Sequence, residues 1–282
     1  NFRREHLRLA QRSHYVIPNG GSQPNVVPSE ASVWYYFREL DYDHIKELHE
    51  LGQTMAEAAA MMTGTEVSER VLGATWERSM SKPLAELMHA NILAVGMPEW
   101  TEDDQALARA AQEMMGSRVR GLPTEVDTIL RESQQGTGGG SDDISEISWQ
   151  LPTIQLRYPG QIPGMTGHHW SSGIAMATPI AHKGANVGSR VIAMTAMDLI
   201  GDPAEVEEAW RYFREVTTAE RTWISLIPEG TEPPTFLNEE RMARFRPLLE
   251  PLRYDPSRYD SYLEQLGVDY PGLTRPDSVG GG

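Results

Sequence analysis

The pattern of apolar and polar positions predicts a chain of helices with a few strands near its start. Apolar residues recur every three or four positions in several stretches that begin at a capping residue or end near a glycine. These predicted helices are residues 41–63, 81–95, 101–115, 178–200 and 203–216. Aromatic and β-branched residues predict strands at 13–17 and 31–38, and weaker patterns predict strands at 65–79 and 154–157.

The two stronger strands flank a turn, since Asn-Gly and Gly-Gly pairs at residues 18–21 supply the positive φ angles that tight turns need. Alternation divides the second strand between two faces, with Val33, Tyr35 and Phe37 on one and Trp34, Tyr36 and Arg38 on the other. Residues 1–80 therefore resemble most of a split β-α-β unit whose first strand would precede residue 1.

Later in the chain, residues 117–140 form a predicted long polar loop that ends in three glycines. Loops of this length inside a domain are usually functional or disordered. In the predicted helix 178–200, the small residues Gly184, Ala185 and Gly188 are expected to allow close packing.

Composition narrows the classes of partner. A formal net charge of -15 argues against nucleic acid and anionic membranes, because no basic stripe is available to neutralise phosphates. The chain has no cysteine and no apolar run long enough to span a bilayer, which fits a cytoplasmic protein. It opens on Asn1 in a polar, helix-like stretch without an initiator methionine, so we expect it to start inside a longer parent; a processed or trimmed start explains the same residues equally well.

Two adjacent histidines are candidate metal ligands. His168 and His169 lie in a loop rich in glycine and proline, where functional groups are often held. Imidazole is a common zinc ligand. Neighbouring side chains point apart, so only one of the two is expected to bind a given ion. One histidine does not make a catalytic zinc site, which takes about three protein ligands.

Asn25, Arg38 and the run Gly140-Ser141-Asp142 are candidates for substrate contacts. A guanidinium at the end of an apolar strand could clamp a carboxylate through two hydrogen bonds. Asn25 could donate to the same ligand or to a reaction oxyanion. The alternatives are a surface ion pair for Arg38, a turn-stabilising side chain for Asn25 and a flexible linker for the glycine-rich run.

At these residues the chain resembles the zinc amidohydrolase and carboxypeptidase superfamily. That superfamily has an Asn-hydrophobic-hydrophobic-Pro turn with an arginine thirteen residues after the asparagine, and Asn25 and Arg38 keep this spacing. Further segments resemble the branch formed by the B-type subunits of p-aminobenzoyl-glutamate hydrolase. They are residues 59–65, 82–91, 139–149, 163–170 and 177–184.

This resemblance implies an α+β lid domain that dimerises and is inserted in an α/β zinc-peptidase-like catalytic domain, with only the C-terminal portion present. Residues 1–80 would be most of the lid, and residues 81–282 would be the C-terminal half of the catalytic domain. The cofactor implied is a pair of divalent ions, zinc or else manganese. The partners implied are a second copy held through the lid, and either a related subunit or a separate N-terminal chain.

The resemblance also implies roles for single residues. Asn25 would reach the scissile carbonyl in a partner's site, and Arg38 would reach the substrate carboxylate. The Gly-His-x-Trp pattern assigns the metal ligand to His168 rather than His169. Gly140, Ser141 and Asp142 would line the pocket.

The implied activity is hydrolysis of the amide of a small N-acyl or N-aroyl amino acid, with a metal-bound hydroxide as the attacking group and a glutamate as base. The superfamily's other ligand motifs and its glutamate pair have no counterpart in residues 1–282, so we expect the chain to be catalytically incomplete by itself. A non-catalytic dimerisation or regulatory fragment, or one half of a split enzyme, are the alternatives.

Overall fold

The computed structural model describes residues 5–128 and 140–273, and the chain divides into two compact units. The first unit holds the described residues of 1–79, 132–151 and 217–234, and the second holds those of 80–131, 152–216 and 235–282. The assignment of a lid and a catalytic domain to parts of the chain stays a prediction. Among the described helices, none combines the length and apolar character that a membrane crossing requires.

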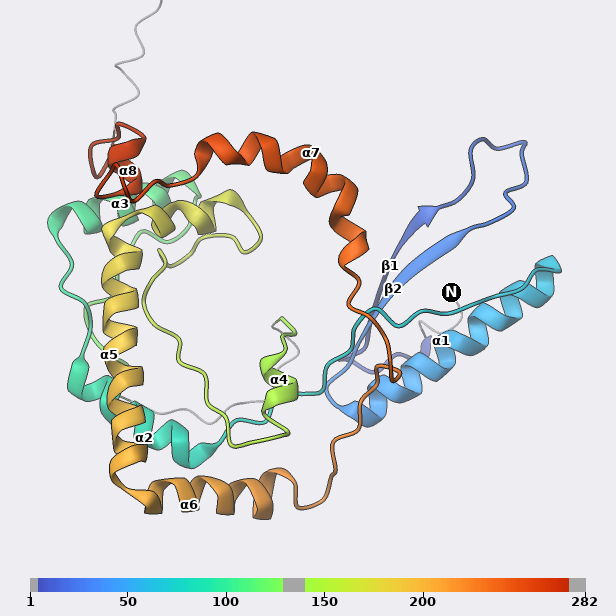
Figure 1. The fold of residues 1–282 in the computed structure, drawn as a ribbon, viewed down its shortest axis with the longest axis horizontal. Helices are drawn as coiled ribbons and strands as arrows, with labels where there is room; N and C mark the ends of the chain where they lie inside the picture. The colour runs from blue at the N-terminus through green and yellow to red at the C-terminus, as the bar shows by residue number, and fades with distance from the viewer. Residues whose placement is uncertain (1–4, 129–139, 274–282) are drawn as a thin grey trace, which may run out of the picture. The chain divides into compact units, whose positions relative to one another are not determined.

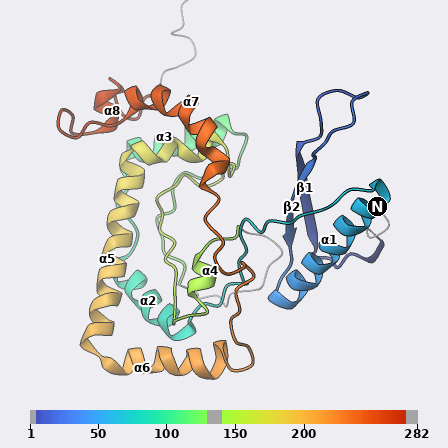
Figure 2. The ribbon, with the colours of Figure 1, turned by 45° about the vertical axis from the view of Figure 1, so that its right-hand side comes forward.

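The first unit is built on a two-stranded antiparallel sheet with a long helix beside it (Figures 1 and 2). Its elements are β1 (Arg12–Asn19), β2 (Ser32–Arg38), α1 (Tyr42–Thr63) and the short α4 (Ile144–Ile147). Phe37 packs against α1 so closely that a Cβ on Gly52 would lie 2.7 Å from its ring. The face with Phe37 therefore carries α1, and the face with Arg38 points away from it.

The second unit is helical in its regular elements. They are α2 (Lys82–Val95), α3 (Glu102–Met114), the 3-10 helix η2 (Trp170–Ala177), α5 (Pro179–Gly201), α6 (Pro203–Tyr212), the 3-10 turns η4 (Thr235–Asn238) and η5 (Glu250–Leu252), α7 (Glu239–Leu249) and α8 (Tyr262–Gln265). A π-helical turn, η3 (Phe213–Thr217), follows α6.

All five predicted helices are confirmed, although the last is α-helical only to Tyr212 and continues as a π-helical turn. Three of their starts and one of their ends have the predicted chemistry. The Asp41 side chain accepts a hydrogen bond from the His44 backbone at the start of α1, and Gly64 ends that helix with a left-handed φ of 62°. Thr101 and Asp104 form the predicted capping box of α3. Asp202 caps α6 by accepting from the Ala204 backbone.

Two weaker strand predictions are wrong: residues 65–79 and 154–157 contain no strand. A strand needs a neighbouring strand to pair its backbone groups, and β1 and β2 pair only with each other among the described residues. Residues 65–79 are held through other contacts instead. For example, Glu69 accepts a hydrogen bond from Gln53 of α1 at 2.7 Å.

The predicted loop 117–140 is described at residues 117–128 and 140, and these residues contain neither helix nor strand. Gly138 and Gly139 lie outside the described residues.

Trp76 is the centre of the first unit, with only 5% of its surface exposed. Its ring stacks on Tyr42 at 4.2 Å between centroids and lies 4.8 Å from Trp149. Its backbone N–H donates to Glu146 at 2.6 Å, and its indole N–H donates to the carbonyl of Ile224 at 2.8 Å. Trp76 thus joins α1, α4 and residues 217–234 into one unit.

The second unit has an apolar core where α3 and α5 meet the segments between them. Its buried members are Ala108, Ala111, Leu122, Ile162, Ala175 and Ile180. The predicted close packing of α5 is confirmed at two of its three small residues. A Cβ on Gly184 would lie 2.7 Å from the Gly160 Cα, and one on Gly188 would lie 2.9 Å from the Tyr158 ring. Ala185 is exposed, so its predicted packing role is wrong.

Asp104 ties three parts of the second unit together with a fully buried carboxylate. It accepts hydrogen bonds from Lys183 of α5 at 2.6 Å, from the Tyr270 hydroxyl at 2.7 Å and from the Thr101 backbone at 2.8 Å. Burial by itself would raise the pKa of Asp104, but these donors outweigh it and hold the pKa below its usual value. The same contact, after burial, raises the pKa of Tyr270.

Replacement of the Asp104 carboxylate tests whether its contacts with Lys183, Tyr270 and Thr101, here called the Asp104 clamp, stabilise the second unit. Asp104→Asn is expected to destabilise the chain by about 2 kcal/mol at neutral pH, because Lys183 loses its counter-charge in a buried site. A lowered folded pKa contributes stability above the unfolded pKa of about 3.9, and this contribution is lost as the pH falls through the folded value. The difference between wild type and variant in urea denaturation should therefore shrink below about pH 4.

The control is Asp103→Asn, which removes the same charge from an exposed position in the same helical turn. It should change stability by less than about 0.5 kcal/mol. An Asp104→Asn variant as stable as this control at pH 7 would contradict the clamp.

Candidate functional site

Arg38 lies at the end of β2, on the face of the sheet that points away from α1. Its side chain is half-buried. Among residues 5–128 and 140–273 no carboxylate pairs with it, so the surface ion pair considered from the sequence does not form there. A planar donor group without a counter-charge can bind an incoming carboxylate through two hydrogen bonds.

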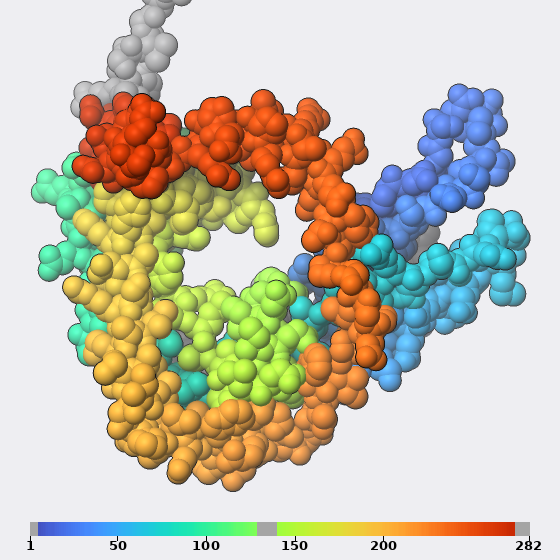
Figure 3. All heavy atoms as spheres, in the orientation of Figure 1, coloured from blue at the N-terminus to red at the C-terminus, as the bar shows by residue number. Residues whose placement is uncertain are grey.

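The exposed loop of residues 20–31 joins β1 to β2 (Figure 3). Asn25 is one of its residues. The loop is ordered locally by a turn in which the Val26 backbone donates to the Gln23 carbonyl at 3.1 Å. This loop precedes the first residue of β2, whereas Arg38 is its last residue. Seven strand residues span about 20 Å at roughly 3.3 Å each, so the structure places Asn25 and Arg38 at opposite ends of β2. Their roles stay predictions.

The run Gly140-Ser141-Asp142 belongs to the same unit as the hairpin and leads into α4. Gly140 and Ser141 are exposed. Asp142 forms an ion pair with Arg78 at 2.5 Å, while its other carboxylate oxygen is buried and accepts no hydrogen bond from the described residues. A carboxylate fixed by a guanidinium can orient a substrate or a neighbouring polar group.

Arg78 is a residue of this site that the sequence did not indicate. Its segment is fixed because the Ser79 backbone donates to the Ser148 hydroxyl at 3.0 Å, and because the Trp149 indole donates to the Glu77 carbonyl at 2.7 Å. Residues 76–79 and 142–149 are far apart in the chain, and no motif marks their contact. The signal that could have found it is the one tryptophan in each segment, Trp76 and Trp149, because tryptophan is highly buried on average.

His168 and His169 occupy different local environments in the second unit. The His169 ring accepts a hydrogen bond from the Ser171 backbone at 3.3 Å and lies 2.9 Å from the Ser171 hydroxyl, so it caps η2. The His168 side chain is exposed and makes no such contact, and its backbone has a φ of 55°. Left-handed backbone is uncommon at residues other than glycine, although histidine is among the types that adopt it more readily, and strained positions of this kind cluster at functional sites.

The described residues do not by themselves form a zinc site. Within these residues no three side chains of histidine, cysteine, aspartate or glutamate gather closely enough to hold a metal ion. His168 fits as a single imidazole ligand, since neither ring nitrogen is used in a hydrogen bond within the described part of the chain. His169 fits less well, because one of its ring nitrogens is already used in the cap of η2.

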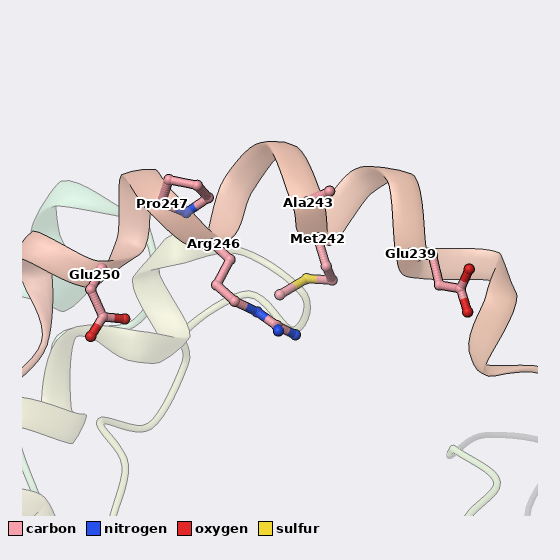
Figure 4. Close-up of a pocket in the computed structure, with 6 residues that line it drawn as sticks. All are labelled: Glu239, Met242, Ala243, Arg246, Pro247 and Glu250. Carbon is pink, nitrogen blue, oxygen red and sulfur yellow. The ribbon is translucent and has the colours of Figure 1, made fainter.

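A shallow pocket on the second unit does not coincide with any predicted site residue. Its lining comes from one face of α7 and the turn that follows it (Figure 4). The residues are Glu239, Met242, Ala243, Arg246, Pro247 and Glu250. Glu239 and Arg246 lie on α7 and Glu250 lies in the turn after it, all three exposed, so this pocket offers neither enclosure nor converging groups.

The class of protein is indicated by comparison with known proteins. No family model matches the chain. The sequence is similar to hydrolases of one peptidase superfamily, and the resemblance predicted from the motifs is confirmed.

The particular relatives are the B-type subunit of p-aminobenzoyl-glutamate hydrolase and the Xaa-Arg dipeptidases. The chain is 28% identical over 257 residues to the hydrolase subunit from Escherichia coli strain K12, which covers 83% of this chain and 53% of that protein. It is 34% identical over 221 residues to the mouse dipeptidase, covering 75% and 42%, and 22% identical over 213 residues to the human one, covering 72% and 40%. The chain thus spans about half the length of the curated relatives it matches.

The different environments of the two histidines predict different effects of replacement. His169→Ala is expected to lower stability by about 1 kcal/mol, because η2 loses its cap. His168→Gly should leave the stability unchanged or raise it slightly, because glycine adopts a φ of 55° without strain. Thermal unfolding of both variants measures this, and a larger loss for His168→Gly than for His169→Ala would show that the cap assignment is wrong.

Proposed function

We propose that this chain is part of a metal-dependent amidohydrolase that cleaves the amide bond of an N-acyl or N-aroyl amino acid. Within this proposal Arg38 receives the substrate carboxylate, and Gly140, Ser141 and Asp142 line the pocket. Asn25, which lies at the opposite end of β2, would face the scissile carbonyl in a partner's site. Residues 1–80 would act as the lid, and residues 81–282 as the C-terminal half of the catalytic domain.

The names of the relatives support this class of reaction. One is a hydrolase of p-aminobenzoyl-glutamate, which is an aroyl amino acid, and the others are dipeptidases. Both substrates contain an amide bond followed by an amino acid with a carboxylate. The shared chemistry is therefore hydrolysis of an amide next to a carboxylate. The acyl group differs from one relative to another.

The observation that carries the proposal is the guanidinium of Arg38. It lies at a fixed strand end, away from α1, without a carboxylate partner in the described part of the chain. Arg8, earlier in the same unit, is by contrast paired with Glu39 at 2.7 Å and with Glu47 at 2.9 Å. Arg38 is instead available to an anion that arrives from solution.

The metal in this proposal is zinc, or else manganese, and the complete site would hold two ions. His168 would provide one ligand. Because the described residues gather no further ligands around it, the remaining ligands and the catalytic base would come from elsewhere in the active assembly. The chain taken alone is then a binding component that does not turn over substrate.

The proposed partners are a second copy of the chain, joined through the lid, and a related subunit or an N-terminal chain. Within residues 5–128 and 140–273, both strands of the hairpin are edge strands, whose unpaired backbone groups favour association. Their apolar side chains are about half exposed: 62% for Tyr15, 57% for Val16 and 52% for Tyr36. The relative from Escherichia coli is itself named as a subunit. The proposed location is the cytoplasm.

A non-catalytic fragment that only dimerises or regulates is the second candidate. The exposed hairpin favours it as strongly as it favours an enzyme, since both use this surface for association. The two candidates differ at Arg38, which a purely associative role does not require.

Binding of p-aminobenzoyl-glutamate to the chain tests the role of Arg38. Arg38→Gln is expected to weaken binding about tenfold, the loss of one charge-assisted contact. The matched control is Lys46→Gln, which removes one positive charge from an exposed position on α1 of the same unit. Calorimetric titration of the three proteins gives the dissociation constants, and equal constants for all three would contradict the role.

Metal content and turnover test the rest of the proposal on the same preparation. With zinc added, the isolated chain is expected to hold fewer than two ions and to release no p-aminobenzoate. A chain that holds two zinc ions and releases p-aminobenzoate would contradict its incompleteness. Failure of the wild-type chain to bind p-aminobenzoyl-glutamate would favour the purely associative candidate.

A further inference from the structure

The register of the hairpin places a second arginine directly opposite Arg38. Arg12 is the first residue of β1 and Arg38 is the last residue of β2, and the two are paired across the sheet. The register is regular from Arg12 to Val16, and the irregularity falls farther along, between Val16 and Asn19. Side chains directly opposite one another lie on the same face, with Cβ atoms about 5 Å apart. Both guanidinium groups therefore lie on the face that points away from α1.

Two like charges at directly opposed positions destabilise a strand pair. Neither arginine is compensated by a carboxylate among the described residues. Arg8, a few residues earlier, shows that this part of the chain can neutralise a guanidinium, because it binds Glu39 and Glu47. The sheet thus places two arginines at opposed positions, without a carboxylate partner in the part of the chain that the structure describes, although the net charge of the chain is -15.

The surroundings of the pair suit a small anion that also has an apolar part. His14 and Tyr36 form the next cross-strand pair on the same face, and Val16 and Trp34 form the one after it. Trp34 and Tyr36 contact each other edge to face, with ring centroids 5.7 Å apart. The aromatic acyl group of a ligand could lie along these rings while the carboxylates of its amino-acid portion meet the arginines.

We propose that Arg12 and Arg38 form a two-cation site that selects a substrate with two carboxylates, such as an N-aroyl glutamate. This inference rests on the proposed function, and it adds the residue that distinguishes a dicarboxylic amino acid from a monocarboxylic one. Arg38 binds the α-carboxylate, and Arg12 binds the side-chain carboxylate. The dianion then removes the repulsion between the two guanidinium groups. The second carboxylate therefore contributes more to the binding free energy than an isolated surface ion pair would.

Two ligands that differ by one charge test the proposal on the full chain. N-benzoylglutamate has two carboxylates, and N-benzoylglutamine replaces the side-chain carboxylate by an amide of nearly the same shape. Wild type is expected to bind N-benzoylglutamate about tenfold more tightly in calorimetric titration at low salt. The preference should shrink as salt is added, because these charges are exposed.

The two arginine variants should separate the two contacts. Arg12→Gln is expected to abolish the preference while the affinity for N-benzoylglutamine stays within about twofold of wild type. Arg38→Gln should weaken both ligands. An Arg12→Gln variant that keeps the preference, or that weakens both ligands equally, would overturn the inference while the role of Arg38 stands. Absence of binding by wild type to either ligand would overturn both.

Thermal unfolding without ligand distinguishes a binding role from a structural one. If Arg12 serves binding, Arg12→Gln should unfold at the same temperature as wild type or a higher one, because the like-charge contact is relieved. Arg12→Lys keeps the charge and should retain part of the preference for N-benzoylglutamate. A lower unfolding temperature for Arg12→Gln, together with no rescue by Arg12→Lys, would show that the residue is structural.

Discussion

The first unit depends on Trp76 and on the hydrogen bonds that its two N–H groups make. The backbone N–H reaches Glu146 and the indole N–H reaches the carbonyl of Ile224, so three distant segments meet at one buried ring. Glu146 also accepts from the Trp223 indole at 2.5 Å, which closes the connection between the later two segments. Because Trp76 is buried, leaving either of its N–H groups without an acceptor would cost about 1–3 kcal/mol.

This arrangement brings candidate binding residues from distant parts of the sequence into one unit. Arg78, in the segment 76–79, pairs with Asp142. Helix α1 packs on one face of β2, and Arg38 lies on the other. The hairpin then presents Arg12 and Arg38 as a pair whose position is set by strand register rather than by flexible loops. Binding groups on regular elements are held more firmly than groups on loops. In the proposed function, the positive charge of this surface would bind the carboxylates of an acylated amino acid.

Local chemistry made the helices and the main hairpin predictable from the sequence. Capping at Asp41, Thr101 and Asp202 needs only neighbouring residues, as does the left-handed stop at Gly64. The strand prediction at 65–79 failed because pairing depends on a partner that sequence patterns do not reveal.

The candidate site was predictable only where a motif or an alternation pointed to it. Asn25, Arg38 and His168 follow from motifs and spacing, whereas Arg78 required the contact between two segments about 70 residues apart. Arg12 required the strand register, which links positions 26 residues apart in the sequence, 38 less 12. The distance between Asn25 and Arg38 along β2 likewise comes from the structure, because a fixed spacing in the sequence fits more than one loop path.

Nuclear magnetic resonance of the arginine Nε–H groups tests the central claim most directly, because it reports which guanidinium groups meet the ligand. When p-aminobenzoyl-glutamate is added to the labelled chain, the Arg12 and Arg38 resonances are expected to shift together and to saturate at one ligand concentration. The Arg8 resonance should stay in place, since that side chain is already bound to Glu39 and Glu47. Shifts confined to other arginines, with Arg12 and Arg38 unchanged, would contradict the account.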